Sequence, residues 1–381
     1  MNFREMNFRE IKIENINQFL DRIKKLESKN GNSLFYRGHS NKEFKLEPSI
    51  YRKNDKGDFL YIENEDKIYR ETIAKVPYEF KGKNTIESLV LMQHYGVPTR
   101  ILDLTTNPLV ALYFACLENK DKDGEVIVFD IPQECTCYFD SDRVTVLANL
   151  AKCKNYFYYE DGNIPNYKEF IKDLEERSYY EVEVGEYLKK AKEVIGKINN
   201  YIKKNKNFFK KTVDDLIKEI EVKENEYVFV EGFKRVVENL LWKERISINK
   251  NYFGELLHFI KEDKSYFQNI INPDDVGSVF AIKPKLDNPR IVRQHGAFLI
   301  FGIRKSPYFN WNKLPTKDMA KVPLNWIKKG GALSESKIII EKFKKKSILK
   351  ELDKLGINKS TLFPEIDKVA DYIKEIYTAK N

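Results

Sequence analysis

The sequence predicts an α+β protein with a mixed β core built from strands near both ends of the chain, separated by a helical, lysine-rich insertion. Stretches rich in Val, Ile and Phe lie before residue 132 and again after residue 270, which is typical of strands. Between about residues 151 and 250, Gly and Pro become scarce and apolar residues recur at helical spacing. The expected divisions are a helical lead-in over 1–30, a first domain over 31–132, the insertion over 133–270, and C-terminal strands and helices over 271–381.

Helices and strands alternate in the first part of the chain. Apolar residues recur near helical spacing over 11–30, until KNGNS breaks the pattern before the strand-like LFYRG. Residues 63–76 also look helical, and a further helix ends before Gly96. The extended RILDL follows, then Asn107 can cap a helix that has Pro108 at its first position, before the buried strand EVIVFDI.

The middle of the chain contains an amphipathic helix with a basic outer face. Residues 187–211 carry nine lysines and one glutamate, and their apolar residues keep a three-four spacing. This face is either solvated or in contact with a nucleic acid, with Tyr201, Phe208 and Phe209 as its aromatic residues.

Strand-like patterns return near the C-terminus. GSVFAIKP, GAFLIFGI and SKIIIEKF are predicted strands. KSILKELDKLGI has a helical period with a glycine at its end, and Pro364 is expected to open the last helix.

Composition excludes few functions. The chain has 67 basic and 58 acidic residues, so its net charge of +9 permits contact with nucleic acid but does not require it. No run reaches the ~18 apolar residues of a membrane span, and the start resembles no signal peptide, so a cytoplasmic location is expected. MNFRE occurs twice at the start, so Met6 is an alternative to Met1 as the first residue. Four cysteines lack metal-site spacing, so no metal site is expected, and Cys116 reads as a core residue.

Three of the four histidines stand beside or one residue from a glycine, in polar segments that also hold arginines. If these segments converge, they form a pocket rich in donors suited to phosphate or carboxylate. The candidate ligand-binding residues are His39, Arg52, His94, Tyr95, Arg100, Thr105, Arg293 and His295.

Arg37 in FYRGHS raises a question, because a guanidinium at the end of a buried strand needs a partner. Asp103 could pair with it, or an anionic ligand could. Thr105 and Thr106 precede the helix that begins at Pro108, where unpaired N–H groups also favour an anion.

FYRGHSNKEFKLEPSIYR, QHYGVPTRILDLTTNPLVALYFA and NPRIVRQHGAF together resemble the FRG domain family. The resemblance covers about residues 30–130, and RQHGAF and the C-terminal tail look like the segments that usually follow the domain. Family members more often have glutamine at the positions of His39 and His295, and tryptophan at that of Leu104. Histidine, like the glutamine that it replaces, has a side chain that can form hydrogen bonds, whereas leucine in place of tryptophan removes a stacking surface.

An analogy with ADP-ribosyltransferase-like folds follows from the order of these segments. It implies Arg37 as a phosphate or ribose anchor, Thr106 beside the nicotinamide and Gln294 as an orienting residue, with NAD as a substrate. Asp103 is the candidate for the carboxylate that glycosidic cleavage needs. The expected function is binding of an anionic, nucleotide-type ligand in a pocket around Arg37, and the analogy implies that such a protein is an ADP-ribosyltransferase or NAD glycohydrolase with a toxin or antiviral role. The alternatives are a non-enzymatic nucleic-acid-binding module and a structural pocket held by an Arg37–Asp103 pair.

Overall fold

A computed structural model describes residues 10–29, 31–159, 246, 249–305, 317–327 and 337–378. The chain divides into two compact units. The first comprises Met1–Lys154, Ser278–Gly302 and Met319–Asn381, and the second comprises Asn155–Gly277 and Ile303–Asp318. The lysine-rich helix predicted over 187–211 lies outside the described residues, and the predicted domain boundaries stay predictions.

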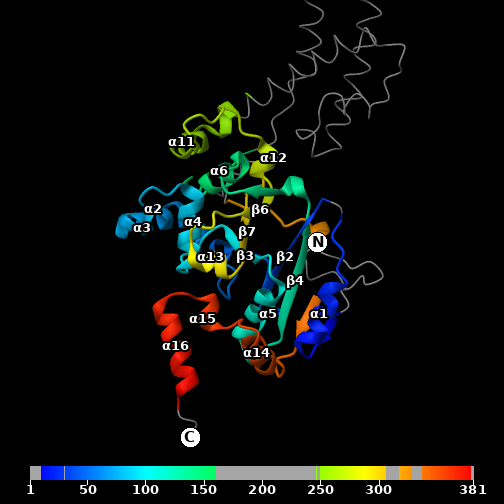
Figure 1. Cartoon of the computed structure of the whole chain (residues 1–381). Coiled ribbons are helices and arrows are strands. Elements are labelled where there is room, and N and C mark those ends of the chain that lie inside the picture. Colours follow the sequence, from blue (N-terminus) through cyan, green and yellow to red (C-terminus); the bar gives the residue numbers. More distant parts are fainter. Residues whose placement is uncertain are drawn as a thin grey trace, which may run out of the picture. The chain divides into compact units, whose positions relative to one another are not determined.

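The described strands form one mixed sheet in the first unit, in the order β1-β8-β4-β2-β3-β7-β6-β5 (Figure 1). Their bounds are β1 (Glu10–Ile13), β2 (Ser33–His39), β3 (Ile101–Thr105), β4 (Gly124–Ile131), β5 (Thr136–Tyr138), β6 (Val279–Lys283), β7 (Gly296–Phe301) and β8 (Lys337–Ile340). The pairs β1–β8 and β5–β6 are parallel, and the other pairs are antiparallel. Early and late strands alternate in space, which confirms the α+β class and the core predicted from both ends of the chain.

Most described helices belong to the first unit. They are α1 (Ile16–Lys24), α2 (Glu65–Lys75), α3 (Pro77–Phe80), α4 (Thr85–His94), α5 (Pro108–Leu117), α6 (Asp142–Asn149), α13 (Pro289–Arg293), α14 (Lys345–Lys354), α15 (Lys359–Leu362) and α16 (Ile366–Tyr377). Single 3₁₀ turns are η2 (Ser49–Tyr51), η3 (Ile62–Asn64), η4 (Gln133–Cys135) and η8 (Leu324–Trp326). The strand β5 and the helix α6 fall within 133–270 and belong to the first unit.

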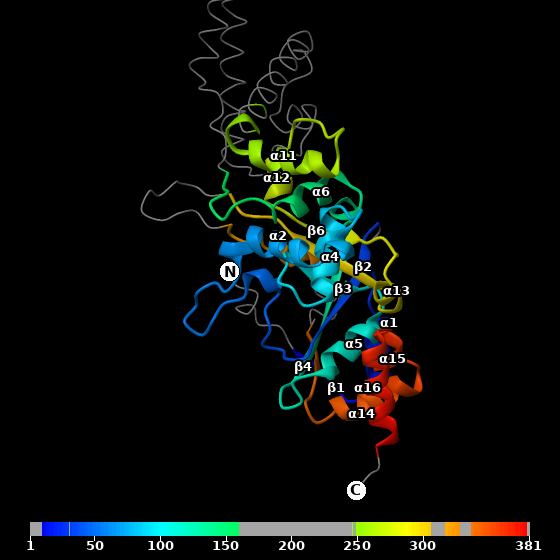
Figure 2. The ribbon, with the colours of Figure 1, turned by 90° about the vertical axis from the view of Figure 1, so that its left-hand side faces the viewer.

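Helix α5 packs across β2 and β4, with α1 and α14 on the same side (Figures 1 and 2). Two glycines permit the close approach of α5. A Cβ at Gly38 would stand 1.9 Å from the Ala111 carbonyl oxygen, and one at Gly124 would stand 2.2 Å from that of Ala115. Cys116 is 1% exposed in this core, as its sequence context predicts, and burial raises the pKa of its thiol to about 12.

The opposite side of the sheet has a second core. Phe35, Phe129 and Leu299 come from three different strands and pack there with Trp326. Alternate residues of β2 therefore enter different cores, since Tyr36 packs with the α5 side.

Two expectations about helix bounds are wrong. Residues 11–13 belong to β1 because Ile11 and Ile13 pair in parallel with β8, and the helix begins only at Ile16. Pro364 does not occupy the first turn of the last helix, because Glu365 is the residue that precedes α16.

The second unit is described in part, by α11 (Gly254–Asp263), α12 (Pro273–Val276) and short segments. Phe253 is fully buried in this unit. The centroid of its ring lies 6.5 Å from that of Phe157 and 5.5 Å from that of Tyr159. Asn249 exchanges two hydrogen bonds with the backbone of Ile271, at 2.6 and 2.9 Å. Across the described part of the chain, no helix has the length and apolar character to cross a membrane.

Candidate functional site

The sheet is split between β2 and β3. These strands share a single ladder position, Tyr36 with Thr105. Away from this position β2 and β3 no longer pair with each other, and β2 pairs only with β4 while β3 pairs only with β7. Side chains of both strands line a cavity of about 360 Å³ at this split.

The cavity lies wholly within the first unit. Its lining comes from β2 and the segment after it, from β3, β7, α4, α5 and α13, and from the segment before α16. The polar lining residues are Arg37, His39, Ser40, Arg52, Gln93, His94, Asp103, Thr105, Glu118, Arg290 and Gln294.

Arg37 spans the split between the strands. Its Nη1 donates to the backbone carbonyl of Asp103 at 2.6 Å, and its Nε donates to Nε2 of His39 at 2.9 Å. No hydrogen bond from Nη2 is found among the described residues. Desolvation lowers the pKa of the Arg37 guanidinium, the charge of Asp103 opposes this change, and Arg52 lowers the pKa further. The guanidinium nevertheless stays charged.

His39 accepts a hydrogen bond from Arg37 and helps to hold its guanidinium in place. It is 2% exposed, and its Nδ1 lies 3.9 Å from the carboxylate of Glu125, which is 1% exposed and opposite His39 in the β2–β4 register. Because Nε2 accepts from Arg37, the ring proton of neutral His39 is on Nδ1, facing Glu125.

Arg52 is the second arginine of the cavity. Its side chain is exposed, and within the described part of the chain it forms neither a hydrogen bond nor an ion pair. Phe44, which is 48% exposed, lines the same cavity. The cavity thus has two cationic groups on one side and an available aromatic ring.

Asp103 does not form the buried pair with Arg37 that the sequence suggested as an alternative. Its side chain is exposed, and Arg37 binds its backbone oxygen. The carboxylate Oδ2 accepts from Gln93 Nε2 at 2.7 Å, and Gln93 in turn accepts from Thr99 at 2.7 Å. A carboxylate is therefore held in a defined position at the cavity wall.

The start of α5 is capped from within the chain. The side chain of Asn107 accepts from the N–H of Leu109 at 2.9 Å, as predicted for a capping residue. Thr105 accepts from the N–H of Asn107 and donates to the carbonyl of Gln294 at 2.7 Å. Thr106 is exposed and does not line the cavity.

The residues around Gln294 hold the C-terminal segment. Gln294 donates to the carbonyl of Leu362 at 3.0 Å, and Arg293 donates to the carbonyls of Ser360 and Thr361 at 3.4 and 3.5 Å. Gln294 still lines the cavity, whereas Arg293 and the exposed His295 do not.

His94 lies at the cavity edge and contacts the chain's own Glu365. Its Nε2 is 2.6 Å from Glu365 Oε1, and Nη1 of Arg290 is 3.7 Å from the same oxygen. Burial and Arg290 lower the pKa of His94, against the effect of Glu365. The neighbouring Tyr95 is 69% exposed and lies outside the cavity lining.

Arg100 is separate from the cavity. Its side chain is 0% exposed and makes a bidentate ion pair with Glu65, which is 3% exposed. Its Nη1 also donates to the carbonyl of Phe301 at 2.9 Å. Each nitrogen of the Arg100 guanidinium therefore donates a hydrogen bond inside the fold.

The sequence analysis did not predict several of the lining residues. Gln93 is one of them, although it stands next to His94 at the start of QHYGVPTR, a segment that resembles the FRG family. Arg290 and Phe363 belong to C-terminal segments whose approach to the cavity no local pattern indicated. Glu118 is an exposed carboxylate at the end of α5 that looks like an ordinary surface residue.

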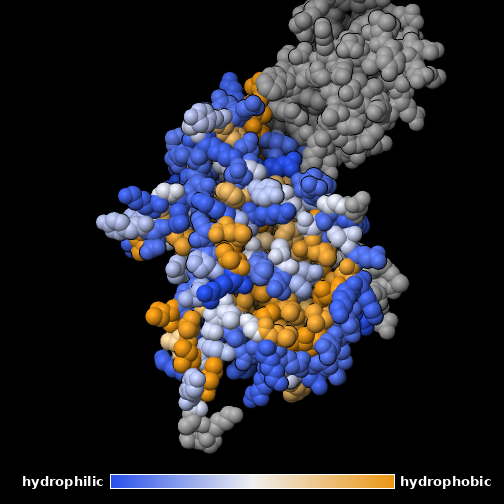
Figure 3. Space-filling model, in the orientation of Figure 1, coloured by the Kyte–Doolittle hydropathy of each residue, from blue (hydrophilic) through white to orange (hydrophobic). Residues whose placement is uncertain are grey.

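One part of the lining is apolar. Helix α5 contributes Ala111, Phe114 and Leu117, and Phe363 packs edge-on against Phe114 with ring centroids 6.0 Å apart. Hydrophobic surface is visible over the region of α5 in Figure 3. The cavity therefore combines a polar side with a hydrophobic one.

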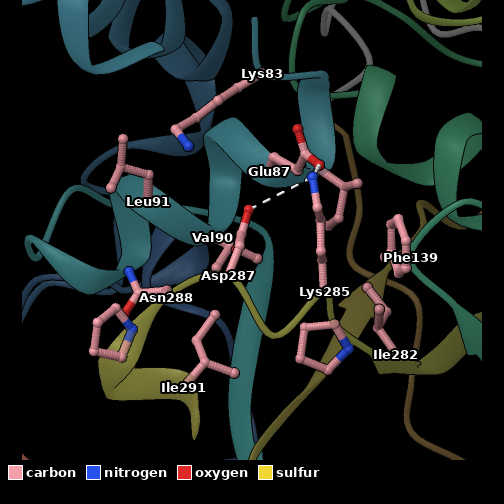
Figure 4. A pocket seen from close by; sticks show the side chains of 13 residues that line it. Lys83, Glu87, Val90, Leu91, Phe139, Ile282, Lys285, Asp287, Asn288 and Ile291 are labelled. Carbon is pink, nitrogen blue, oxygen red and sulfur yellow. Dashed lines mark hydrogen bonds and ion pairs between the residues drawn. The ribbon is translucent and has the colours of Figure 1, made fainter. Parts of the chain in front are cut away.

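A second, smaller cavity of about 140 Å³ is lined by α4 and α13 and shares Val90 and Ile291 with the first (Figure 4). Lys285 spans its mouth, 3.4 Å from Glu87 and 3.7 Å from Asp287. Its volume is below the ~300 Å³ typical of small-molecule sites. Among the residues that the structure describes, no cluster of three or more His, Cys, Asp or Glu is placed to hold a metal ion.

Residues 32–124 match the FRG domain, so the chain contains an FRG domain in this part. The match ends at the start of β4 and excludes Arg290, Gln294 and Phe363, which complete the cavity. No curated protein and no solved structure shows significant similarity to the chain.

Proposed function

We propose that the cavity binds a nucleotide-type ligand whose anionic group lies between Arg37 and Arg52. The observation that carries this proposal is the pair of guanidinium groups facing one cavity. The side chain of Arg52 has no hydrogen-bond or ion-pair partner in the described part of the chain, and Nη2 of Arg37 has none either. An anion there would relieve the mutual repulsion of the two cations and fill their vacant donors.

The remainder of the cavity suits the rest of such a ligand. Its volume of about 360 Å³ falls within the ~300–1,000 Å³ of small-molecule sites. Phe44 and the apolar wall of Phe114 and Leu117 can receive a planar, weakly polar group such as a base. These features favour a nucleotide over a simple inorganic anion.

Ligand-induced changes in melting temperature test the proposal. A panel of orthophosphate, pyrophosphate, ADP and NAD should contain at least one compound that stabilises the wild-type protein. Arg52→Gln should weaken that binding at least tenfold without lowering the melting temperature of the unliganded protein, because the Arg52 side chain is exposed and makes no hydrogen bond or ion pair with the residues that the structure describes. Arg304→Gln, which removes an exposed arginine outside the cavity, is the matched control. A wild-type protein that responds to no compound in the panel would overturn the proposal.

The finer part of the proposal is that the ligand is NAD and that it is cleaved. Water would add to the ribose carbon as the N-glycosidic bond breaks, releasing nicotinamide and ADP-ribose. Asp103 would stabilise the positive charge that develops on the ribose, since Gln93 already orients its carboxylate. Neither Thr106, which is outside the cavity, nor Gln294, which binds Leu362, is needed for this step.

Chromatographic detection of nicotinamide tests this step separately. Asp103→Asn should retain NAD binding and reduce nicotinamide release at least a hundredfold. Binding of NAD by the wild-type protein without any release of nicotinamide would leave a binding module and reject the enzymatic part.

A further inference from the structure

We propose that Arg290 and His94 form a second anion-binding subsite in the same cavity, and that the chain's own Glu365 occupies it in this structure. This inference deepens the proposed function and rests on it. It predicts a ligand with two anionic groups, one held by Arg37 and Arg52 and the other by Arg290 and His94.

The contacts of Glu365 are those that an anionic ligand would make. Its Oε1 lies 2.6 Å from Nε2 of His94 and 3.7 Å from Nη1 of Arg290. Both partners line the cavity and come from different helices, α4 and α13. Arg290 is itself positioned, because it donates to the carbonyl of His94 at 3.3 Å and lies 4.5 Å over the ring of Phe363.

Glu365 is an imperfect occupant of this subsite. Its Oε2 is buried and has no hydrogen-bond partner among the described residues. A buried carboxylate oxygen without a donor loses its hydration without compensation. A phosphate or carboxylate that also reached the donors of the cavity would not carry this penalty.

The segment after Glu365 is held by surface contacts, among them the hydrogen bond from Tyr372 to Asp353 at 2.7 Å and the ion pair of Lys359 with Asp371 at 3.4 Å, and such contacts cost little to break. Helix α16 follows immediately, and none of its residues is buried. By contrast, residues 360–363 are held by Arg293, Gln294 and the packing of Phe363. Displacement of Glu365 therefore opens the second subsite without removing the wall that Phe363 provides.

Titration calorimetry with inorganic pyrophosphate tests the subsite. Glu365→Gln keeps the size of the side chain but removes the competing charge, so pyrophosphate should bind about tenfold more tightly than to wild type. Arg290→Gln in the same chain should abolish this gain. Glu365→Ala should reproduce the gain, and Glu375→Gln, an exposed carboxylate of α16 that pairs with Lys359, should behave as wild type.

The outcomes separate this inference from the proposed function. If pyrophosphate binds the wild-type protein through Arg52, but neither Glu365 variant binds it more tightly, Glu365 is only structural and the second subsite is rejected. If neither the wild type nor the Glu365 variants bind pyrophosphate, ADP or NAD, both proposals are rejected. A gain that persists in the variant combining Glu365→Gln with Arg290→Gln also overturns the assigned subsite.

Discussion

Two arginines that look equivalent in the sequence have different uses in the structure. Arg37 and Arg100 both stand next to a predicted strand, and both were candidates for a ligand site. Arg37 faces the cavity with Nη2 available, whereas Arg100 is fully buried and paired with Glu65. Glu65 lies 35 positions earlier in an ordinary helical stretch, so no local pattern could reveal the pair.

The Arg100–Glu65 pair yields a prediction about stability. Arg100→Gln should lower the free energy of unfolding by about 3–5 kcal/mol, because it leaves the Glu65 carboxylate buried without its cation. Chemical denaturation followed by circular dichroism measures this change.

A matched control separates burial from charge. Lys75→Gln breaks the exposed pair with Glu71 in α2, the helix that carries Glu65, and should cost less than about 1 kcal/mol. Replacing Arg100 and Glu65 together with Met and Leu should restore part of the stability. Equal small losses for Arg100→Gln and Lys75→Gln would contradict the structural role of the buried pair.

At the scale of the element, the glycine that follows Arg37 in FYRGHS has a role in packing. Gly38 lies where α5 crosses β2, and its neighbour Arg37 reaches across the split between β2 and β3. The motif therefore joins a residue that faces the cavity to one that admits the helix bordering the cavity.

Substitution of this glycine should be costly. Gly38→Ala would place a Cβ 1.9 Å from the Ala111 backbone oxygen, so α5 would have to shift, with an expected loss of at least about 3 kcal/mol. Thermal melts of the variant test this expectation. Gly254→Ala is the control, because its Cβ would meet nothing within 4 Å, and its melting temperature should stay close to that of wild type. A Gly38→Ala protein as stable as this control would refute the close packing of α5.

The contact between α4 and the C-terminal segment should depend on pH. Burial lowers the pKa of His94 below its ordinary value of 6.5. Desolvation opposes ionisation of Glu365, but hydrogen bonds from its own N–H and from His94 lower its pKa below 4.5. Both groups thus bind fewer protons when the contact is formed, so the contact is stable above about pH 6.5 and weakens as the pH falls.

Hydrogen exchange measures this pH dependence. Corrected for intrinsic rates, the amides of α16 should lose protection between about pH 6.5 and 4. Glu365→Gln should already have low protection at pH 7 and a flatter profile. Protection that rises toward low pH in the wild type would show that the sign is wrong.

At the scale of the whole molecule, the FRG domain depends on segments that follow it in the chain. Strand β3 pairs along all five residues with β7, and β4 pairs with β8. Lys345 of α14 donates to the carbonyls of Ser40, Glu118 and Asn119, at 2.6, 3.0 and 3.0 Å. Without these late segments, strand edges and carbonyl groups of the domain would lose their partners.

A fragment of residues 31–132 should therefore lack a stable fold. We expect no cooperative thermal transition by circular dichroism and poorly dispersed amide resonances, whereas the full chain should melt cooperatively. A fragment that unfolds cooperatively would show that the domain is independent of β7, β8 and α14.

The candidate site was predictable in part. Arg37, His39 and Asp103 could be predicted as site residues because they belong to strands and motifs that are clear in the sequence. They line the cavity, as do the predicted residues Arg52, His94, Thr105 and Gln294. Tyr95, Arg100, Thr106, Arg293 and His295 do not line it, because their orientation depends on neighbours distant in sequence. Whether the lining residues bind a ligand stays a prediction.

The sequence by itself determined the α+β class, most helix and strand positions, the cap at Asn107 and the core role of Cys116, since all of these depend on local pattern and composition. Only the tertiary structure decided that β7 and β8 complete the sheet, that Arg100 is paired with Glu65, and that Glu365 contacts His94 at the cavity edge. Such contacts join segments far apart in the chain, and their geometry depends on how the strands order in the sheet. Arg37 therefore has two hydrogen-bond partners within the fold, the carbonyl of Asp103 and the buried His39, and its side chain also lines the cavity.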